Sequence, residues 1–254
     1  AVDIGRKAAA ANLADIAAVG AVPTALVVAF AAPGDLPVSW AVQCTSGIRE
    51  EAATVGARIV GGDVAAAAQI VIAITAIGDL QGRDAVRRSG AVAGDVVVVA
   101  GRLGWSAAGL AVLGRGFRSP KVLVDAHRFP TPPYAAGPTA ALAGATAMID
   151  VSDGLIADAR HLAEASGVDL HIETDGWEIP EPIATAAAAY HVDPRQWMLT
   201  GGEDHALLAT FPASATVPAD FRVIGRVTAC AEAEPGVVVD GYRTSVPGGH
   251  EHFR

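Results

Sequence analysis

Two acidic side chains three residues apart, Asp150 and Asp153, lie where a short apolar segment runs into a helical pattern. Residues 147–149 are hydrophobic, and from Ser152 onward apolar residues recur at helical spacing until Gly167. One acid at a helix start is explained by capping, which either Ser152 or Asp153 could provide. A second acid at the end of a strand is costly, because neighbouring carboxylates repel each other unless a cation shares the site. The pair therefore favours a metal or phosphate site over a capped helix alone.

Further acids occur next to glycines or on predicted helices. Glu203 and Asp204 follow two glycines and precede an apolar strand, where an ordinary acidic hairpin is the alternative. Asp63 follows Gly61 and Gly62, and a plain turn would also explain that pattern. Asp15 lies on the first predicted helix, where a solvated face is the alternative. Carboxylates distributed in this way suit a nucleotide site with several Mg²⁺ ions, since each ion takes one or two carboxylates and completes its shell with phosphate oxygens and water.

Composition limits the class of protein. The chain has 254 residues, of which 52% are hydrophobic and 18% charged, enough for one large domain or two modest ones. The net charge of −9 argues against nucleic acid as the main partner. Two distant cysteines, Cys44 and Cys230, imply neither a disulfide framework nor a thiolate metal site, so a reducing cytoplasm is the simplest setting. The apolar runs are too short to cross a bilayer, and the first residues of this sequence do not show the basic, apolar, cleavable pattern expected of a leader.

Hydrophobic periodicity predicts alternating helices and strands, with a domain boundary at residues 78–83 where glycine and charged residues interrupt the pattern. Helices are predicted at 7–19, 37–55, 106–113, the segment ending at 167, and 183–190. Strands are predicted at 25–31, 58–60, 69–77, 95–100, 147–149, 169–173, 205–211, 221–227 and 237–239.

Several familiar site patterns do not fit. A P-loop needs a Gly-Lys pair, and the two lysines, Lys7 and Lys121, lie in other settings. The turn that begins at Gly101 could present amides to an anion, but it does not match a dinucleotide-binding turn. A nucleophile elbow around Ser106 would need glycine where Ala108 stands. The His-Glu-His segment at 250–252 is more typical of a solvated tail than of a metal site.

Taken together, the segments resemble the bacterial thiamine-monophosphate kinases, in order and spacing along nearly the whole chain. Each motif alone is loose, but six in register are specific. A glycine- and histidine-containing ending at 248–253 also favours the kinases over other members of their superfamily, which includes aminoimidazole-ribonucleotide synthetase, selenophosphate synthetase and a hydrogenase-maturation dehydratase. The six motifs lie at 12–23, 61–63, 88–95, 106–110, 149–155 and 201–204.

The resemblance implies an α+β fold of two domains, with an ATP- and Mg-binding, dimerising mixed α/β domain at 1–80 and a C-terminal α/β domain at 81–254. The implied reaction is Mg-assisted in-line transfer of the ATP γ-phosphoryl group to thiamine monophosphate, giving thiamine diphosphate. Implied magnesium ligands are Asp15, Asp63, Asp150 and Asp153. Implied ATP contacts are Gly62, Asp63, Arg88 and Ser152, with Arg88, Asp150 and Asp153 serving catalysis. Glu203 and Phe253 match contacts to thiamine monophosphate.

Family members begin with roughly fifty more residues, a number that varies with domain size, and this segment carries further metal ligands and a substrate-contacting histidine. The N-terminal domain is therefore expected to lack its first strands. Two alternatives follow: another ATP-dependent synthetase or dehydratase of the superfamily, or a non-catalytic nucleotide-binding dimer if the missing ligands are truly absent. The resemblance also implies a homodimer, because pairing the N-terminal domains would bury exposed strands.

Overall fold

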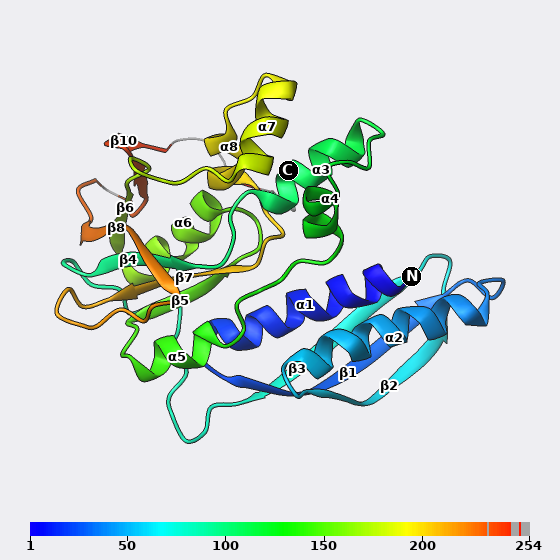
Figure 1. The fold of residues 1–254 in the computed structure, drawn as a ribbon. Helices are drawn as coiled ribbons and strands as arrows, with labels where there is room; N and C mark the ends of the chain where they lie inside the picture. Colours follow the sequence, from blue (N-terminus) through cyan, green and yellow to red (C-terminus); the bar gives the residue numbers. More distant parts are fainter. Residues whose placement is uncertain (233, 245–248, 250–254) are drawn as a thin grey trace.

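The chain folds around two β-sheets with helices packed on them (Figure 1). The computed structural model describes residues 1–232, 234–244 and 249. The first 80 residues contribute a three-stranded sheet, and the remainder contributes a seven-stranded sheet. Both sheets mix parallel and antiparallel pairs, so the observed architecture is α+β, as the sequence predicted.

The N-terminal layer consists of a small sheet covered on one face by two helices. In the sheet, the strand order is β2-β1-β3, with β1 parallel to β2 and antiparallel to β3. Leu13, Leu26 and Ile48 form the centre of its core. The elements are α1 (Val2–Ala18), β1 (Val22–Ala32), α2 (Val38–Thr54), β2 (Arg58–Ala66) and β3 (Val71–Asp79).

The two helices of this layer approach each other closely at glycines. A Cβ atom at Gly5 of α1 would lie 1.9 Å from the carbonyl oxygen of Cys44, and one at Gly47 of α2 would lie 2.1 Å from that of Val2. Such distances are far below van der Waals contact, so any side chain at either position would push the helices apart. This contact fixes the position of α1, which carries Arg6, Lys7 and Asp15.

The second sheet forms the larger core. Its strand order is β10-β9-β6-β8-β4-β7-β5. Helix α6 packs on one face, while α5 and the end of α1 pack on the other. The buried central strands therefore read as continuous apolar runs. The elements are β4 (Val96–Ala100), α3 (Trp105–Gly114), α4 (Lys121–Arg128), α5 (Ala136–Leu142), β5 (Ala147–Val151), α6 (Leu155–Ser166), β6 (Val168–Ile172), α7 (Glu181–Tyr190), α8 (Pro194–Thr200), β7 (Ala206–Phe211), β8 (Phe221–Ala229), β9 (Val237–Val239) and β10 (Tyr242–Arg243).

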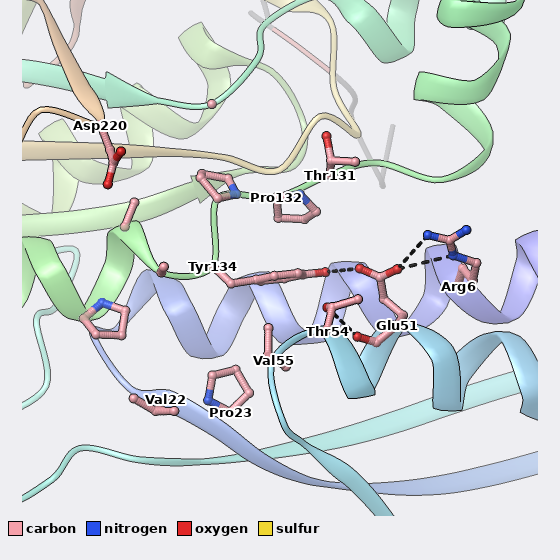
Figure 2. Close-up of a pocket in the computed structure, with 15 residues that line it drawn as sticks. Arg6, Val22, Pro23, Glu51, Thr54, Val55, Thr131, Pro132, Tyr134 and Asp220 are labelled. Atoms are coloured by element: carbon pink, nitrogen blue, oxygen red, sulfur yellow. Dashed lines mark hydrogen bonds and ion pairs between the residues drawn. The ribbon is translucent and has the colours of Figure 1, made fainter.

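A buried carboxylate joins the two layers. The Tyr134 hydroxyl donates to Glu51 Oε1 at 2.8 Å, and the Arg6 guanidinium approaches Glu51 Oε2 at 3.4 Å (Figure 2). Burial and the neighbouring Glu51 charge raise the pKa of Tyr134, so its hydroxyl keeps its proton and remains a donor. The three residues border a cavity of about 840 Å³ between α1, α2 and the proline-rich segment before α5. The contacts of Glu51 with Arg6 and Tyr134 therefore connect α1 and α2 to the segment that leads into the larger sheet.

Most predicted elements are observed; three short helices and the two-residue strand β10 were missed, and β2 is longer than predicted. Strand β2 does not end before its glycines but continues through them. Glycine at 62 permits this close pairing with β1, since a Cβ atom there would lie 2.1 Å from the Val28 carbonyl oxygen. The missed helices are α4, α5 and α8, each of eight residues or fewer. Helix α8 carried a signal, since Asp193 caps it immediately before Pro194. In the part of the chain that the structure describes, no helix is both long and apolar enough to cross a membrane.

Candidate functional site

The site begins at the turn between β5 and α6. Gly154 lies at the N-cap with φ 137°, a conformation that favours glycine. Asp158 Oδ2 accepts hydrogen bonds from the amides of Asp153 at 3.0 Å and Gly154 at 3.1 Å. Burial raises the pKa of Asp158 to about 7, although these amide bonds act in the opposite direction. Asp158 therefore fixes the two residues that precede α6, whose N-cap is Gly154 without a side-chain capping bond, so neither Ser152 nor Asp153 is the N-cap.

The segment Gly201–His205 lies directly against this turn. The Glu203 amide donates to the Ser152 carbonyl oxygen at 2.7 Å, and the His205 amide donates to that of Val151 at 3.0 Å. A Cβ atom at Gly202 would lie 2.4 Å from the Ser152 oxygen, so the close approach requires glycine there. Two motifs that are distant in the sequence thus form one surface.

Backbone conformation in this segment is unusual for residues with side chains. Glu203 has φ 67° and His205 has φ 51°, both in the left-handed region. Such conformations cost on the order of 1 kcal/mol or more each and persist only where surrounding contacts enforce them. The hydrogen bonds to Val151 and Ser152 are such contacts. The strain is consistent with a functional segment.

At the centre of the site is a hydrogen-bonded pair of buried side chains. His205 Nδ1 lies 3.1 Å from Asp150 Oδ2, and both side chains are almost fully buried. Asp15 of α1 is near enough to interact electrostatically with Asp150. Although Asp15 reaches solvent, the surrounding protein removes part of its hydration and Asp150 repels it, so that its pKa is raised; His205 and Arg88 act in the opposite direction. A carboxylate pair of this kind is a favourable position for a cation.

A second buried acid connects the segment to α3. Asp204 Oδ1 accepts from the Ser106 amide at 2.8 Å, at the N-terminus of that helix, while Oδ2 is buried with no hydrogen-bond partner. Burial raises the pKa of Asp204 to about 7, and the bond from Ser106 only partly offsets this effect. This hydrogen bond holds the N-terminus of α3 against the Gly201–His205 segment.

Near the contact between Asp204 and α3, Lys7 of α1 forms an ion pair with Glu203, the exposed acid of the Gly201–His205 segment. Lys7 Nζ lies 2.5 Å from Glu203 Oε2 and donates to the His127 carbonyl oxygen at 3.0 Å. Burial acts to raise the pKa of Glu203, but Lys7 outweighs it and lowers that pKa. The pKa of His127 is lowered by burial and by Lys7, and its Nδ1 lies 2.9 Å from Ser106 Oγ. Sequence reasoning missed Lys7, His127 and His205, because their spacing carries no motif.

The structure brings together only part of the predicted site. Asp150, Ser152, Asp153 and Glu203 lie in or against the same turn. Asp15 interacts electrostatically with Asp150, and Arg88 interacts electrostatically with Asp15. Gly62 and Asp63 lie on β2 in the other sheet, and Phe253 lies outside the described residues. Nowhere in residues 1–232, 234–244 and 249 do three or more His, Cys, Asp or Glu side chains converge closely enough to hold a metal ion by themselves.

The comparisons with known proteins address the whole chain. The family model for the AIR synthase related protein N-terminal domain matches residues 1–80, and that for the C-terminal domain matches residues 92–238. Thiamine-monophosphate kinase of Mycobacterium tuberculosis H37Rv is 49% identical over 252 residues, covering 99% of this chain and 74% of the relative. The chain belongs to the thiamine-monophosphate kinase family. The Corynebacterium glutamicum thiamine-monophosphate kinase is 41% identical, with 89% of this chain and 69% of the relative covered.

Solved structures extend the family match to three dimensions. The thiamine monophosphate kinase from Aquifex aeolicus matches with a TM-score of 0.87 and 32% identity, covering 96% of this chain and 82% of that chain. AaThiL complexed with AMPPCP and TMP matches with a TM-score of 0.91 and 32% identity, covering 99% and 81%. The hydrogenase maturation protein HypE, at 19% identity and a TM-score of 0.74, shares the fold alone.

Replacing Asp204 with asparagine tests the buried acid. An unfolded carboxyl group has a pKa of about 4, whereas that of folded Asp204 is about 7. Between these values the folded chain holds a proton that the unfolded chain has lost, so stability falls as pH rises. Relative to the unsubstituted chain, Asp204→Asn should gain on the order of a few kcal/mol of unfolding free energy from about pH 5 to about pH 8, measured by urea denaturation. A stability difference that does not change with pH would contradict this assignment.

Proposed function

We propose that the chain transfers the γ-phosphoryl group of ATP to the phosphate of thiamine monophosphate, forming thiamine diphosphate and ADP. The observation that carries the proposal is the joined surface of the β5–α6 turn and Gly201–His205, which combines a buried carboxylate with an exposed one. Support also comes from the names of the relatives and from AaThiL, whose complex contains AMPPCP and TMP.

The residues at the site fit magnesium. Asp150 and Asp15 offer carboxylate oxygens as ligands; burial and then repulsion by Asp150 raise the pKa of Asp15, and a shared cation would remove the repulsion. Mg²⁺ usually takes one or two carboxylates and completes its shell with water and phosphate, so it does not require a cage of three acids. In this proposal Asp15, Asp63, Asp150 and Asp153 hold several Mg²⁺ ions. When bound, the ions neutralise charge on the phosphates.

The other proposed roles follow from the chemistry of joining two anions. No protein nucleophile is needed, because an oxygen of the acceptor phosphate attacks in line. Arg88 provides a fixed positive charge toward the phosphates, and Ser152, Gly62 and Asp63 contact ATP. Glu203 and Phe253 contact thiamine monophosphate, whose cationic ring an acid and an aromatic side chain can bind.

The direct test is product formation by the full-length protein with Mg-ATP and thiamine monophosphate, followed by chromatography. We expect thiamine diphosphate, and at least about a hundredfold lower turnover for Asp150→Asn, since removing one charge-stabilising group in a phosphoryl-transfer site has effects of this size. Asp125→Asn, which removes a carboxylate paired with Lys121 on α4, is the matched control and should retain activity. ATP binding without thiamine diphosphate formation would overturn the kinase proposal and favour a non-catalytic nucleotide-binding protein.

We also propose that residues 1–80 form the ATP- and Mg-binding, dimerising domain, that residues 81–254 form the second domain, and that the protein is a cytoplasmic homodimer. Exposed residues alternate along β3, and the sheet face turned away from α1 and α2 includes Val27, Val71 and Ile77, exposed by 37%, 52% and 48%. A second copy covering this face would bury both apolar surfaces. Cys44 and Cys230 are free, which suits a reducing compartment.

A charged residue on that face should separate the copies. Val71→Lys places an ammonium in the proposed interface, and we expect sedimentation to show a dimer for the unsubstituted protein and a monomer for the variant. Leu142→Lys introduces the same change on α5, where the side chain is 73% exposed, and should leave the dimer intact. An unsubstituted protein that sediments as a monomer at all concentrations would rule out the homodimer.

A further inference from the structure

Lys7 is held between three parts of the chain. It projects from α1, its ammonium pairs with Glu203 Oε2 at 2.5 Å, and it donates to the His127 carbonyl oxygen of α4 at 3.0 Å. Its side chain is 25% exposed, whereas the Glu203 side chain is 52% exposed. The cation is therefore largely covered, and the acid it binds still faces solvent.

This arrangement differs from an ordinary surface ion pair. Lys121 pairs with Asp125 one turn along the same helix and remains 82% exposed, a geometry that contributes little and fixes nothing. Lys7 is anchored to a backbone carbonyl as well as to the carboxylate, so it has little freedom to follow Glu203 if that side chain moves. The Glu203 backbone is also fixed, by its hydrogen bond to Ser152 at 2.7 Å. Both ends of the Glu203 side chain are thus held.

We propose that Lys7 is a positioning residue for the acceptor substrate: it holds one carboxylate oxygen of Glu203 so that the other accepts a hydrogen bond from the amino group of the substrate's pyrimidine ring. This inference rests on the proposed function, in which Glu203 contacts thiamine monophosphate. Lys7 itself touches Glu203 and His127 and acts on the substrate through Glu203.

The role predicts selectivity as well as affinity. A carboxylate oxygen can accept a hydrogen bond but cannot donate one. An analogue of thiamine monophosphate with a carbonyl in place of the amino group would set acceptor against acceptor and should bind more weakly. If Lys7 holds the carboxylate in place, its loss should reduce this preference, because a mobile Glu203 can turn away from the mismatched oxygen.

The experiment compares Lys7→Met, Lys7→Arg and Lys121→Met in the full-length protein. Calorimetry gives Kd for thiamine monophosphate and the carbonyl analogue, and steady-state kinetics give kcat and both KM values. For Lys7→Met we expect Kd and KM for thiamine monophosphate to rise about tenfold, the scale of one charge-assisted hydrogen bond, with kcat and KM for ATP little changed. Preference over the carbonyl analogue should fall about tenfold on the same scale. Lys7→Arg should restore part of both effects, and Lys121→Met should show neither.

Several results would overturn the inference. Tighter binding by Lys7→Met would show that Lys7 competes with the substrate for Glu203, and an unchanged preference would show that Lys7 does not position the carboxylate. The preference is a ratio measured on one sample, so partial unfolding of a variant does not alter it. In a Glu203→Gln background, Lys7→Met should add little; a full additional effect would place the action of Lys7 elsewhere.

Failure of the proposed function gives a different pattern. A protein that binds thiamine monophosphate in a Lys7-dependent way but forms no thiamine diphosphate would disprove the kinase proposal and retain the inference. Product formation with no Lys7 dependence of affinity or preference would disprove the inference alone. A protein that does not bind thiamine monophosphate at all would disprove both.

Discussion

Two backbone hydrogen bonds, from the amides of Glu203 and His205 to the carbonyl oxygens of Ser152 and Val151, determine the geometry of the site. They hold the Gly201–His205 segment against the β5–α6 turn. The two segments are so close that position 202 has no room for a side chain and must be glycine. The contact brings the His205 ring to Asp150 and sends the Glu203 side chain toward Lys7. Glu203 and His205 adopt left-handed backbone conformations in this contact, and these conformations are strained.

The electrostatics of the site follow from the same contact. Asp150, Asp158 and Asp204 are all nearly buried, and each is held by a hydrogen bond from a histidine or from backbone amides. Asp15 and Glu203 reach solvent at the edge of the group, the first repelled by Asp150 and the second paired with Lys7. The supporting carboxyl groups Asp158 and Asp204, both with pKa values of about 7, maintain the turn and the start of α3. In the proposed function, the remaining acids of the site are the ones that bind cations and substrate.

The sequence indicated which segments would carry the candidate site, but not how these segments meet. Apolar runs and glycines predicted the strand and helix around Asp150, because periodicity and chain reversal are local properties. The pairing of Lys7 with Glu203 was not predictable, since it joins residues near opposite ends of the chain across the packing of α1 on the larger sheet. The sequence also did not indicate the structural role of Gly62, whose lack of a side chain allows β2 to pass close to the Val28 carbonyl oxygen. Short helices such as α5, which contains Gly137 and Pro138, form through tertiary packing against their intrinsic preferences.

The central claim is that the β5–α6 turn, with Asp150 at its start and Asp15 beside it, binds the metal ions that accompany ATP. Crystals of the full-length protein grown with Mn²⁺ and AMPPCP test this most directly, because the anomalous signal of manganese locates each ion independently of the surrounding map. The account predicts a manganese ion coordinated by Asp150, with phosphate oxygens completing its shell. Bound Mn-AMPPCP with every manganese ion beyond coordination distance of Asp150 and Asp15 would contradict it.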